Sequence, residues 1–188
     1  MTALNKAAAE VITTAHVGAA ALGRPAERSS AALDGGTGVS PVRAERSSAG
    51  QPKAAVPTWS VHALTDITGF GLIGHAREMA LASNVSLVLH SAKIPLLEGA
   101  LDCIRAGHIP GGLKANREFA ECVVEYESGI SEEVKTILFD PQTAGGLLIS
   151  VADDDSAALT RALHAAGVPA IEIGAVLPRT KPLIRVAS

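Results

Sequence analysis

Hydrophobic residues recur with strand or helix spacing from about residue 58 to the end of the chain, and turn residues separate these stretches. Short aliphatic runs bounded by glycine, proline or serine predict strands, and apolar positions three or four residues apart predict helices. The predicted strands span residues 60–65, 86–90, 146–151, 170–173 and 183–186. The predicted helices span residues 72–82, 96–106, 115–124, 132–138 and 157–166. Strands that alternate with helices indicate a layered α/β or α+β domain over residues 58–188.

Polar and glycine residues predict where several of these helices begin and end. Ser131 and Ser156 are expected N-caps, each with acidic residues close to the first turn. Asn84, Gly107 and Gly167 follow the last apolar position of three helices, where a left-handed residue commonly ends a helix. The acidic run at residues 153–155 needs no further explanation than a favourable helix start.

The first 57 residues follow a different pattern. Apolar residues at helical spacing predict an amphipathic helix over residues 2–15. Residues 16–57 are rich in Gly, Pro, Ser and Ala, and the pentapeptide AERSS occurs twice, at residues 26–30 and 44–48. Too few large apolar residues are present to offset the entropy of ordering, so we expect a disordered insert. A basic docking arm is the alternative interpretation, because basic residues outnumber acidic ones in this insert.

Composition and charge exclude several functional classes. The chain has 188 residues, of which 47% are hydrophobic but only 3% aromatic, and its formal net charge is −3. This charge argues against a nucleic-acid partner. No apolar run is long enough to form a spanning helix, so we also expect no association with a membrane. Cys103 and Cys122 are too few for a disulfide framework, and we expect both to be buried on apolar helix faces. Together these features indicate a cytoplasmic protein.

A glycine-rich motif, GFGLIG, occupies residues 69–74, between a predicted strand and a predicted helix. It satisfies the G-x-G-x-x-G pattern of dinucleotide-binding folds, but that function also needs an acidic residue at the end of the next strand. That strand ends at His90 and Ser91 instead. A tight turn into a closely packed helix therefore explains the glycines better.

Asp66 precedes this turn, and its carboxylate has two interpretations. It can cap the turn or the helix by accepting a backbone N–H bond. It can also be a ligand of Mg²⁺, which takes one or two carboxylates and completes its shell with water and phosphate oxygens. The second interpretation needs further ligands from elsewhere.

Two other loops combine proline with paired glycines. The sequence DPQTAGG spans residues 140–146, where the glycines allow close approach of another segment or a ligand. The sequence IPGG spans residues 109–112 and is followed by Lys114, Asn116 and Arg117, which either meet an anion or are ordinary solvated residues. Five histidines lack ligand spacing and are expected to be structural or surface residues: His62, His75, His90, His108 and His164.

In combination, TDITGFGLIGHA at residues 65–76, IPGG with the following Asn-Arg pair, and DPQTAGGLLIS at residues 140–150 resemble the selenophosphate synthetases. More broadly, they resemble the C-terminal domain of the aminoimidazole-ribonucleotide-synthetase-like enzymes that use ATP. The resemblance implies a PurM-like α/β/α domain over residues 58–188. It also implies an interdomain helix over residues 1–15, separated from the domain by the insert at residues 16–57.

The function that the resemblance implies is synthesis of selenophosphate from selenide, ATP and water, with release of AMP and phosphate. Asp66 matches a metal-binding aspartate of the family, so the resemblance favours the Mg²⁺ ligand over the cap. The family's catalytic Cys or selenocysteine, its essential Lys and most of its Mg²⁺ ligands lie in an amino-terminal domain. We therefore expect no catalytic residue in this chain, Mg²⁺ and ATP shared with that domain or with a full-length synthetase, a homodimer in the complete enzyme, and no turnover by the chain alone.

Two other hypotheses stay open at this point. The chain could belong to another ATP-dependent enzyme of the same superfamily, although DPQTAGG argues against it. It could also be a stand-alone module that binds a partner protein.

Overall fold

Strands and helices alternate in the computed structural model, which describes residues 58–142 and 145–188. The strands are β1 (Val61–Asp66), β2 (Val85–His90), β3 (Val124–Tyr126), β4 (Leu147–Val151), β5 (Gly174–Pro178) and β6 (Ile184–Ala187). The helices are α2 (Gly71–Ala82), α3 (Ala100–Arg105), α4 (Gly111–Ala120), α5 (Glu132–Ile137) and α6 (Asp153–Ala165), with 3-10 turns η1 (Ser91–Lys93) and η2 (Glu121–Val123). None of the described helices is long and apolar enough to cross a membrane. The helix expected over residues 2–15 and the insert expected over residues 16–57 lie outside the described residues.

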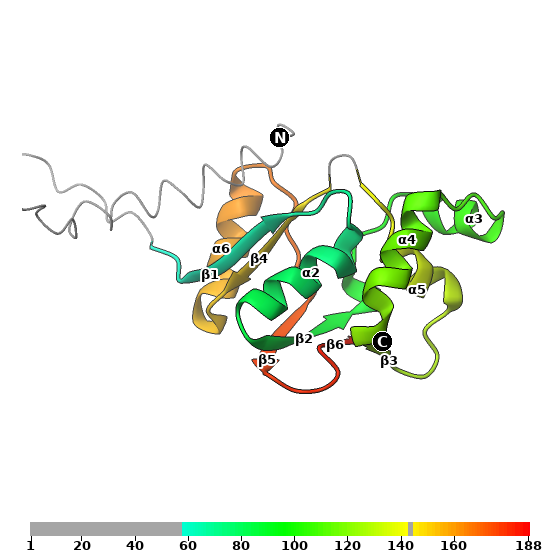
Figure 1. Ribbon diagram of the computed structural model, residues 1–188. Helices are drawn as coiled ribbons and strands as arrows, with labels where there is room; N and C mark the ends of the chain where they lie inside the picture. Colours follow the sequence, from blue (N-terminus) through cyan, green and yellow to red (C-terminus); the bar gives the residue numbers. More distant parts are fainter. Residues whose placement is uncertain (1–57, 143–144) are drawn as a thin grey trace, which may run out of the picture.

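Helices and strands in alternation confirm the predicted α/β or α+β class, and the strands form two sheets. β1 pairs antiparallel with β4 in a two-stranded ribbon, with Asp66 opposite Leu147. The other sheet has the order β3-β6-β2-β5, in which β6 is parallel to both β3 and β2, and β5 is antiparallel to β2. Helix α2 lies on one side of the β1–β4 ribbon and α6 on the other, while α3, α4 and α5 gather at one end of the molecule (Figure 1).

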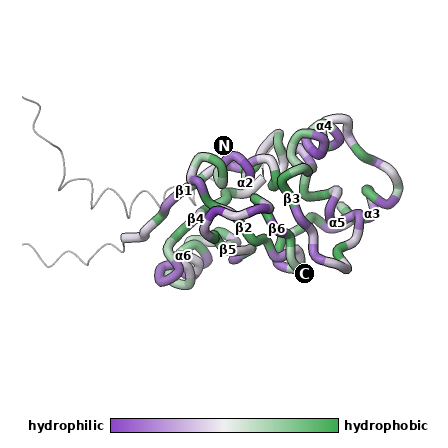
Figure 2. Tube along the Cα trace, turned by 60° about the horizontal axis from the view of Figure 1, so that its bottom comes forward, coloured by the Kyte–Doolittle hydropathy of each residue, from purple (hydrophilic) through white to green (hydrophobic). Residues whose placement is uncertain are grey.

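The main core lies between α2, the four-stranded sheet and α4. Its largest fully buried side chains are Phe139, Ile73, Leu113, Ile184 and Val186. Hydrophobic segments, green in Figure 2, run through the strands at the centre of the molecule, whereas the peripheral helices alternate between green and purple. Burial of such aliphatic side chains is the main contribution to the free energy of folding.

A second, smaller core lies under α6. Trp59, Leu159, Leu163 and Val168 are its buried members, and side chains of β1 and β4 pack against them. Alternate residues of a strand face opposite sides of its sheet. Leu148 therefore packs against the main core, whereas its neighbours in β4 pack against the core under α6.

Several predicted boundaries are confirmed. Ser131 caps α5, because its Oγ accepts a hydrogen bond from the Val134 N–H at 3.4 Å. Asn84 follows α2 in the left-handed conformation with φ of 53°. Gly107 and Gly167 follow α3 and α6 with φ of 79° and 75°.

Two predicted helices have different bounds. The helix expected over residues 96–106 begins only at Ala100, because Gly99 has a left-handed φ of 76° and interrupts the helical path. The helix expected over residues 115–124 begins at Gly111, directly after extended Pro110, and ends at Ala120. The last predicted positions instead form a 3-10 turn, and Val124 starts a strand that the sequence did not predict.

The predicted strand at residues 170–173 is wrong, and the strand β5 forms at Gly174–Pro178 instead. The pairing is possible because Gly174 has no side chain to collide with the Val88 carbonyl of β2. The predicted cap at Ser156 is also wrong. Helix α6 begins three residues earlier at Asp153, and the Ser156 hydroxyl donates to Glu172 Oε2 at 3.0 Å.

The expected burial of the two cysteines is wrong as well. Cys103 and Cys122 are free and exposed. Helix α3 is only six residues long and buries Ile104 alone. Cys122 lies in the 3-10 turn, where the helical spacing that predicted an apolar face no longer holds.

Candidate functional site

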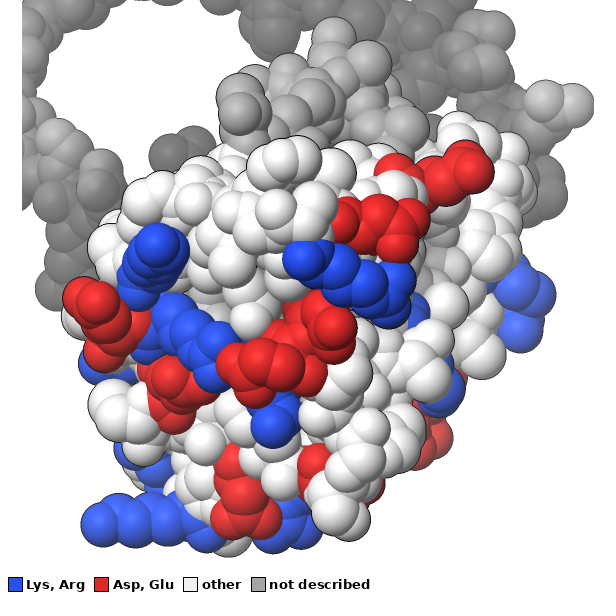
Figure 3. Space-filling model, turned by 90° about the vertical axis from the view of Figure 1, so that its right-hand side faces the viewer, with Lys and Arg blue, Asp and Glu red and all other residues white. Residues whose placement is uncertain are grey.

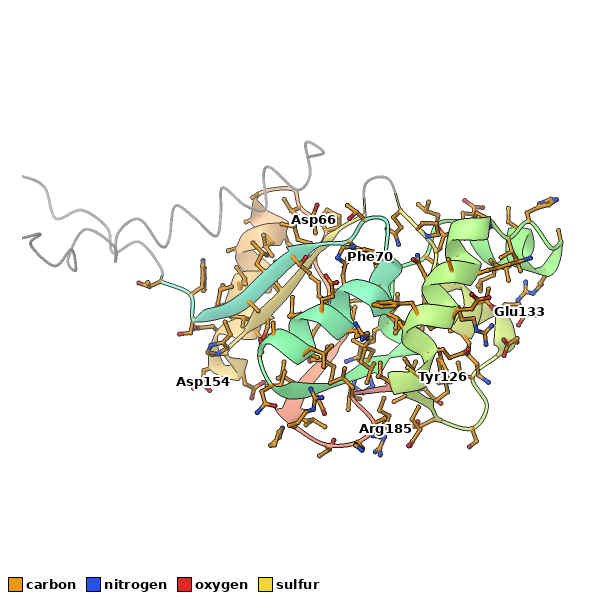
Figure 4. All side chains as sticks on the ribbon, in the orientation of Figure 1. Asp66, Phe70, Tyr126, Glu133, Asp154 and Arg185 are labelled. Carbon is orange, nitrogen blue, oxygen red and sulfur yellow. The ribbon has the colours of Figure 1, made fainter. Side chains whose placement is uncertain are left out.

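The candidate metal ligand, Asp66, is the last residue of β1 and its side chain is exposed. Figure 4 shows it at the upper end of that strand, close to the start of α2. Among the described residues, no hydrogen bond or ion pair to its carboxylate is present, and α2 has no side-chain cap. The described structure therefore gives no support to the capping interpretation, and no described residue occupies the carboxylate oxygens.

The turn that follows Asp66 is bonded to the DPQTAGG segment through the main chain. We call residues 66–71 the Asp66 loop, and residues 140–142 with 145–146 the Pro141 loop. The Ile67 N–H donates to the Gly146 carbonyl at 2.9 Å, and the Ile67 carbonyl accepts from the Gly145 N–H at 3.0 Å. The Gln142 N–H donates to the Thr68 carbonyl at 3.0 Å. Two motifs that lie far apart in the sequence thus form one structural unit.

Glycines allow this close approach. A Cβ at Gly71 would lie 2.7 Å from the Phe139 carbonyl carbon, and Gly71 has a left-handed φ of 68°. A Cβ at Gly145 would lie 2.5 Å from the Ile67 carbonyl oxygen. Gly71 and Gly74 of GFGLIG therefore serve close packing, as predicted, whereas Gly69 has open space around its Cβ position. The dinucleotide-binding alternative is not supported, because β1 and β2 lie in different sheets.

His75 of α2 holds the Asp66 loop through contacts with Thr68. Its ring is buried, and its Nε2 lies 3.1 Å from both the N–H and the Oγ1 of Thr68. A backbone N–H can only donate, so Nε2 is the acceptor in this contact. His75 is therefore a structural residue, in agreement with the sequence-based expectation.

Asn116 of α4 holds the same loop from the other side. Its Nδ2 donates to the Gly69 carbonyl at 2.8 Å and to the Phe139 carbonyl at 3.0 Å. Both amide protons are then used within the protein, so the structure supports neither an anion contact nor an ordinary solvated role for Asn116. No signal in the sequence predicted this role, because the two carbonyl groups lie far from Asn116 in the chain.

Arg117, the other candidate for an anion contact, is held in ion pairs. It lies 2.6 Å from Glu121 and 2.6 Å from Glu132, and it donates to the Thr136 hydroxyl at 3.1 Å. These carboxylates raise the pKa of its guanidinium, and the hydrogen bond that Arg117 donates to Glu121 contributes most. Figure 3 shows positive and negative side chains interleaved over the end of the molecule that carries these helices. Arg117 therefore joins α4 to α5, whereas Lys114 is exposed.

Asp140 is a second carboxylate near the Asp66 loop, and no spacing in the sequence pointed to it as a ligand. It begins the Pro141 loop, and its carbonyl oxygen would lie 3.0 Å from a Cβ at Gly71. Partial burial raises the pKa of its carboxyl group. Within the described residues no cluster of three or more His, Cys, Asp or Glu side chains could hold a metal ion. Among the described residues, Asp66 is thus an exposed carboxylate on a loop held by several hydrogen bonds, and it is not part of a complete metal site.

Comparison with known proteins agrees with this arrangement of motifs. Residues 11–186 match the family profile described as AIR synthase related protein, C-terminal domain. The chain is 42% identical over 129 residues to a selenide, water dikinase of Clostridioides difficile (strain 630), a match that covers 68% of this chain and 37% of that protein. It is 41% identical over 131 residues to selenide, water dikinase 2 of Peptoclostridium acidaminophilum, covering 69% and 38%. It is 46% identical over 107 residues to a selenide, water dikinase of Caldanaerobacter subterraneus subsp. tengcongensis, a match that covers 55% of this chain and 30% of that protein.

These relatives confirm the resemblance that the three motifs indicated. The matched segment spans little more than a third of the length of the first two relatives.

Proposed function

The chain belongs to the family of AIR synthase related proteins, through their C-terminal domain, and we propose on this premise that it is the C-terminal domain of a selenophosphate synthetase. Such an enzyme makes selenophosphate from selenide, ATP and water and releases AMP and phosphate. The identity of 41% and 42% to two selenide, water dikinases over more than two thirds of this chain carries the proposal.

Asp66 is the residue that we assign to the metal of this reaction. Mg²⁺ prefers carboxylate oxygens, keeps several waters and is commonly completed by substrate phosphates. An exposed carboxylate without a described hydrogen-bond partner fits such a shared site, and it does not fit an all-protein cage. When bound, Mg²⁺ would neutralise charge on the phosphates of ATP.

Three neighbouring groups hold the backbone that carries Asp66. His75 holds the backbone of Thr68, Asn116 holds the backbone of Gly69, and the Pro141 loop holds Ile67. Phosphoryl transfer depends on positioning and charge stabilisation, and small displacements of a ligand group are costly. In this proposal, the contacts determine the position of the Asp66 carboxylate relative to the metal.

Catalysis requires further groups in this proposal, because one carboxylate cannot hold Mg²⁺ and activate selenide. The proposed partner is the remaining part of the enzyme, because the relatives are more than twice as long as the matched segment. The proposal includes a homodimer for the complete enzyme. The chain alone is then expected to show no selenide-dependent consumption of ATP.

The test is reconstitution with the part of the C. difficile relative that precedes its matched segment. The full chain is mixed with that part, or fused behind it, and selenide-dependent formation of AMP is measured. We expect AMP from the combination and none from either component. Asp66→Asn should lower the rate at least about tenfold, because a ligand of the charge-neutralising metal is lost.

Asp154→Asn is the matched control, since Asp154 is an exposed carboxylate at the start of α6. It should leave the rate unchanged, and circular dichroism should show that both variants are folded. A combination whose activity is unaffected by Asp66→Asn would contradict the metal assignment. Formation of AMP by the chain alone would contradict the need for a partner.

A further inference from the structure

Phe70 is an exposed aromatic residue in the Asp66 loop, four positions after the proposed metal ligand. Its exposed fraction is 49%, whereas Phe139 of the main core has 0%. Figure 4 shows Phe70 at the beginning of α2, at the same end of the molecule as Asp66. Four Cα–Cα steps span at most about 15 Å, so the backbones of the two residues lie in the same small region of the molecule.

The Phe70 ring is held on its inner side. The ring centroid lies 5.6 Å from that of His75 at an interplanar angle of 53°, and His75 is itself bonded to Thr68. A Cβ at Gly74 would lie 2.6 Å from the Phe70 Cβ, so the glycine provides the space in which Phe70 sits. A buried histidine and a glycine thus support a side chain that remains half exposed.

The three phenylalanines of the chain differ in what covers them. Phe139 is enclosed by the core, and the guanidinium of Arg77 lies 4.4 Å from the centre of the Phe119 ring. Within the described residues, Phe70 has the His75 ring contact alone, which leaves its outer surface to solvent. A fixed aromatic ring with one open side is suited to stacking against a planar ligand.

We propose that Phe70 stacks against the base of the nucleotide whose phosphates meet the metal at Asp66. The inference rests on the proposed function, which supplies the nucleotide and the metal. Stacking on a phenyl ring needs no hydrogen bond, so Phe70 contributes affinity for the base and little discrimination between purines. Phe70 is then a positioning residue, which sets where the nucleoside lies while Asp66 sets where the phosphates lie.

The experiment separates the base from the phosphates by using two probes. The chain, fused behind the part of the relative used for reconstitution, is titrated with MgATP and, separately, with magnesium tripolyphosphate, which has the phosphates but no base. The side-chain NMR resonances of Phe70 are followed, and the dissociation constants are measured. We expect MgATP, and not magnesium tripolyphosphate, to shift the Phe70 ring resonances.

Three variants and a control give the quantitative test. Phe70→Ala should weaken MgATP binding roughly tenfold and leave tripolyphosphate binding unchanged, whereas Phe70→Tyr should bind MgATP as the parent does. Phe119→Ala, which also removes a half-exposed phenyl ring, should change neither constant. Asp66→Asn should weaken both probes.

Stacking is overturned if Phe70→Ala weakens both probes equally or neither, or if MgATP leaves the Phe70 resonances unshifted. The proposed function is judged separately by Asp66→Asn with tripolyphosphate, which contains no base. Loss of reconstituted activity in Phe70→Ala with unchanged MgATP binding would show that Phe70 contacts the remaining part of the enzyme instead of the nucleotide.

Discussion

Gly71 is constrained both by its backbone conformation and by a neighbouring segment of the chain. Its φ of 68° lies in the left-handed region, and the backbone of Phe139 passes where a Cβ would be. Gly69, two positions earlier in the same motif, has nothing within 4 Å of its Cβ position. The two glycines look alike in the sequence but differ in what the structure requires of them.

This difference predicts unequal costs for two identical substitutions. Gly71→Ala should lower the free energy of unfolding by about 2–4 kcal/mol, since it adds both backbone strain and a steric clash. Gly69→Ala should change it by less than about 1 kcal/mol. Urea denaturation of both variants checks this, and similar losses at the two positions would contradict the structural distinction.

Tyr126 is the one tyrosine in the sequence, which makes its ionisation directly observable. Its hydroxyl is buried and has no hydrogen-bond partner within the described structure. Burial, with a smaller contribution from the charge of Glu121, raises the pKa of Tyr126 to about 12. Tyrosinate absorbance should therefore rise near pH 12 in the folded protein and near pH 10 in denaturant.

The sign of the accompanying stability change follows from linkage. The folded-state pKa is above the unfolded value, so the neutral phenol stabilises the folded state fully below about pH 10. That contribution is lost as the pH rises from about 10 towards 12. Tyr126→Phe should remove this part of the alkaline dependence. A titration near pH 10 in protein that is still folded would contradict the burial of the hydroxyl.

At the level of elements, α4 connects the Asp66 loop to α5 and to the segment that follows α5. Asn116 bonds to carbonyl groups of both the Asp66 loop and the segment after α5, and Arg117 pairs with acidic residues on α5 and η2. A single turn of α4 thus holds the Asp66 loop, which lies far away in the sequence, and also α5 with the residues that follow it. The position of the Asp66 loop depends on this helix as much as on β1.

Replacing the amide of Asn116 tests this connection. Asn116→Asp would place a carboxylate against two carbonyl oxygens, and it should cost about 2 kcal/mol or more in the free energy of unfolding. Glu118→Gln, an exposed change on the same helix, should cost less than about 0.5 kcal/mol. Chemical denaturation measures both. Equal stability of the two variants would show that the Asn116 hydrogen bonds contribute nothing.

The sequence predicted element boundaries best where they depend on residues next to one another in the chain. Asn84, Ser131 and the glycines after α3 and α6 act within one turn of their own residues, and these boundaries are confirmed. The strand β5 was missed because Gly174 and Pro178 are poor strand formers, and only the neighbouring strand β2 makes them pair.

The candidate site was predictable in its residues more than in its contacts. Asp66 and the two glycine motifs were recognised from the sequence, but the role of Asp66 as a metal ligand remains a prediction. Asn116 and His75 act through groups brought near by the fold, and no spacing rule connects them to their partners. Phe70 belongs to the GFGLIG motif, but its exposure depends on how α2 packs, and the sequence pattern does not predict that packing.

At the level of the whole molecule, one strand connects two cores. Leu148 of β4 packs on the main core, while Leu147 and Ile149 pack on the core under α6. Neither core can lose the strand without exposing apolar surface in the other. We therefore expect the described domain to unfold in one cooperative transition.

Trp59, the one tryptophan in the sequence, reports on the smaller core. Leu163→Ala should destabilise the protein by about 2–4 kcal/mol, because Leu163 is 4% exposed. Its Trp fluorescence and its far-ultraviolet circular dichroism should still change at the same urea concentration. Leu97→Ala, at a leucine that is 87% exposed, should have almost no effect. A fluorescence transition that precedes the loss of helix would show that the two cores unfold separately.

The main-chain bonding between the Asp66 loop and the Pro141 loop has a consequence for how the two motifs can vary. A hydrogen bond between peptide groups requires no particular side chain, except that proline has no N–H to donate. Positions 67, 142 and 145 donate in this unit, so proline is excluded there on grounds that have nothing to do with chemistry at the site. Gln142, whose side chain is exposed, can otherwise be exchanged widely. The pairing of the two loops thus tolerates many side chains at position 142, whereas Gly71 and Gly145 cannot vary in the same way because a Cβ there would collide with backbone atoms.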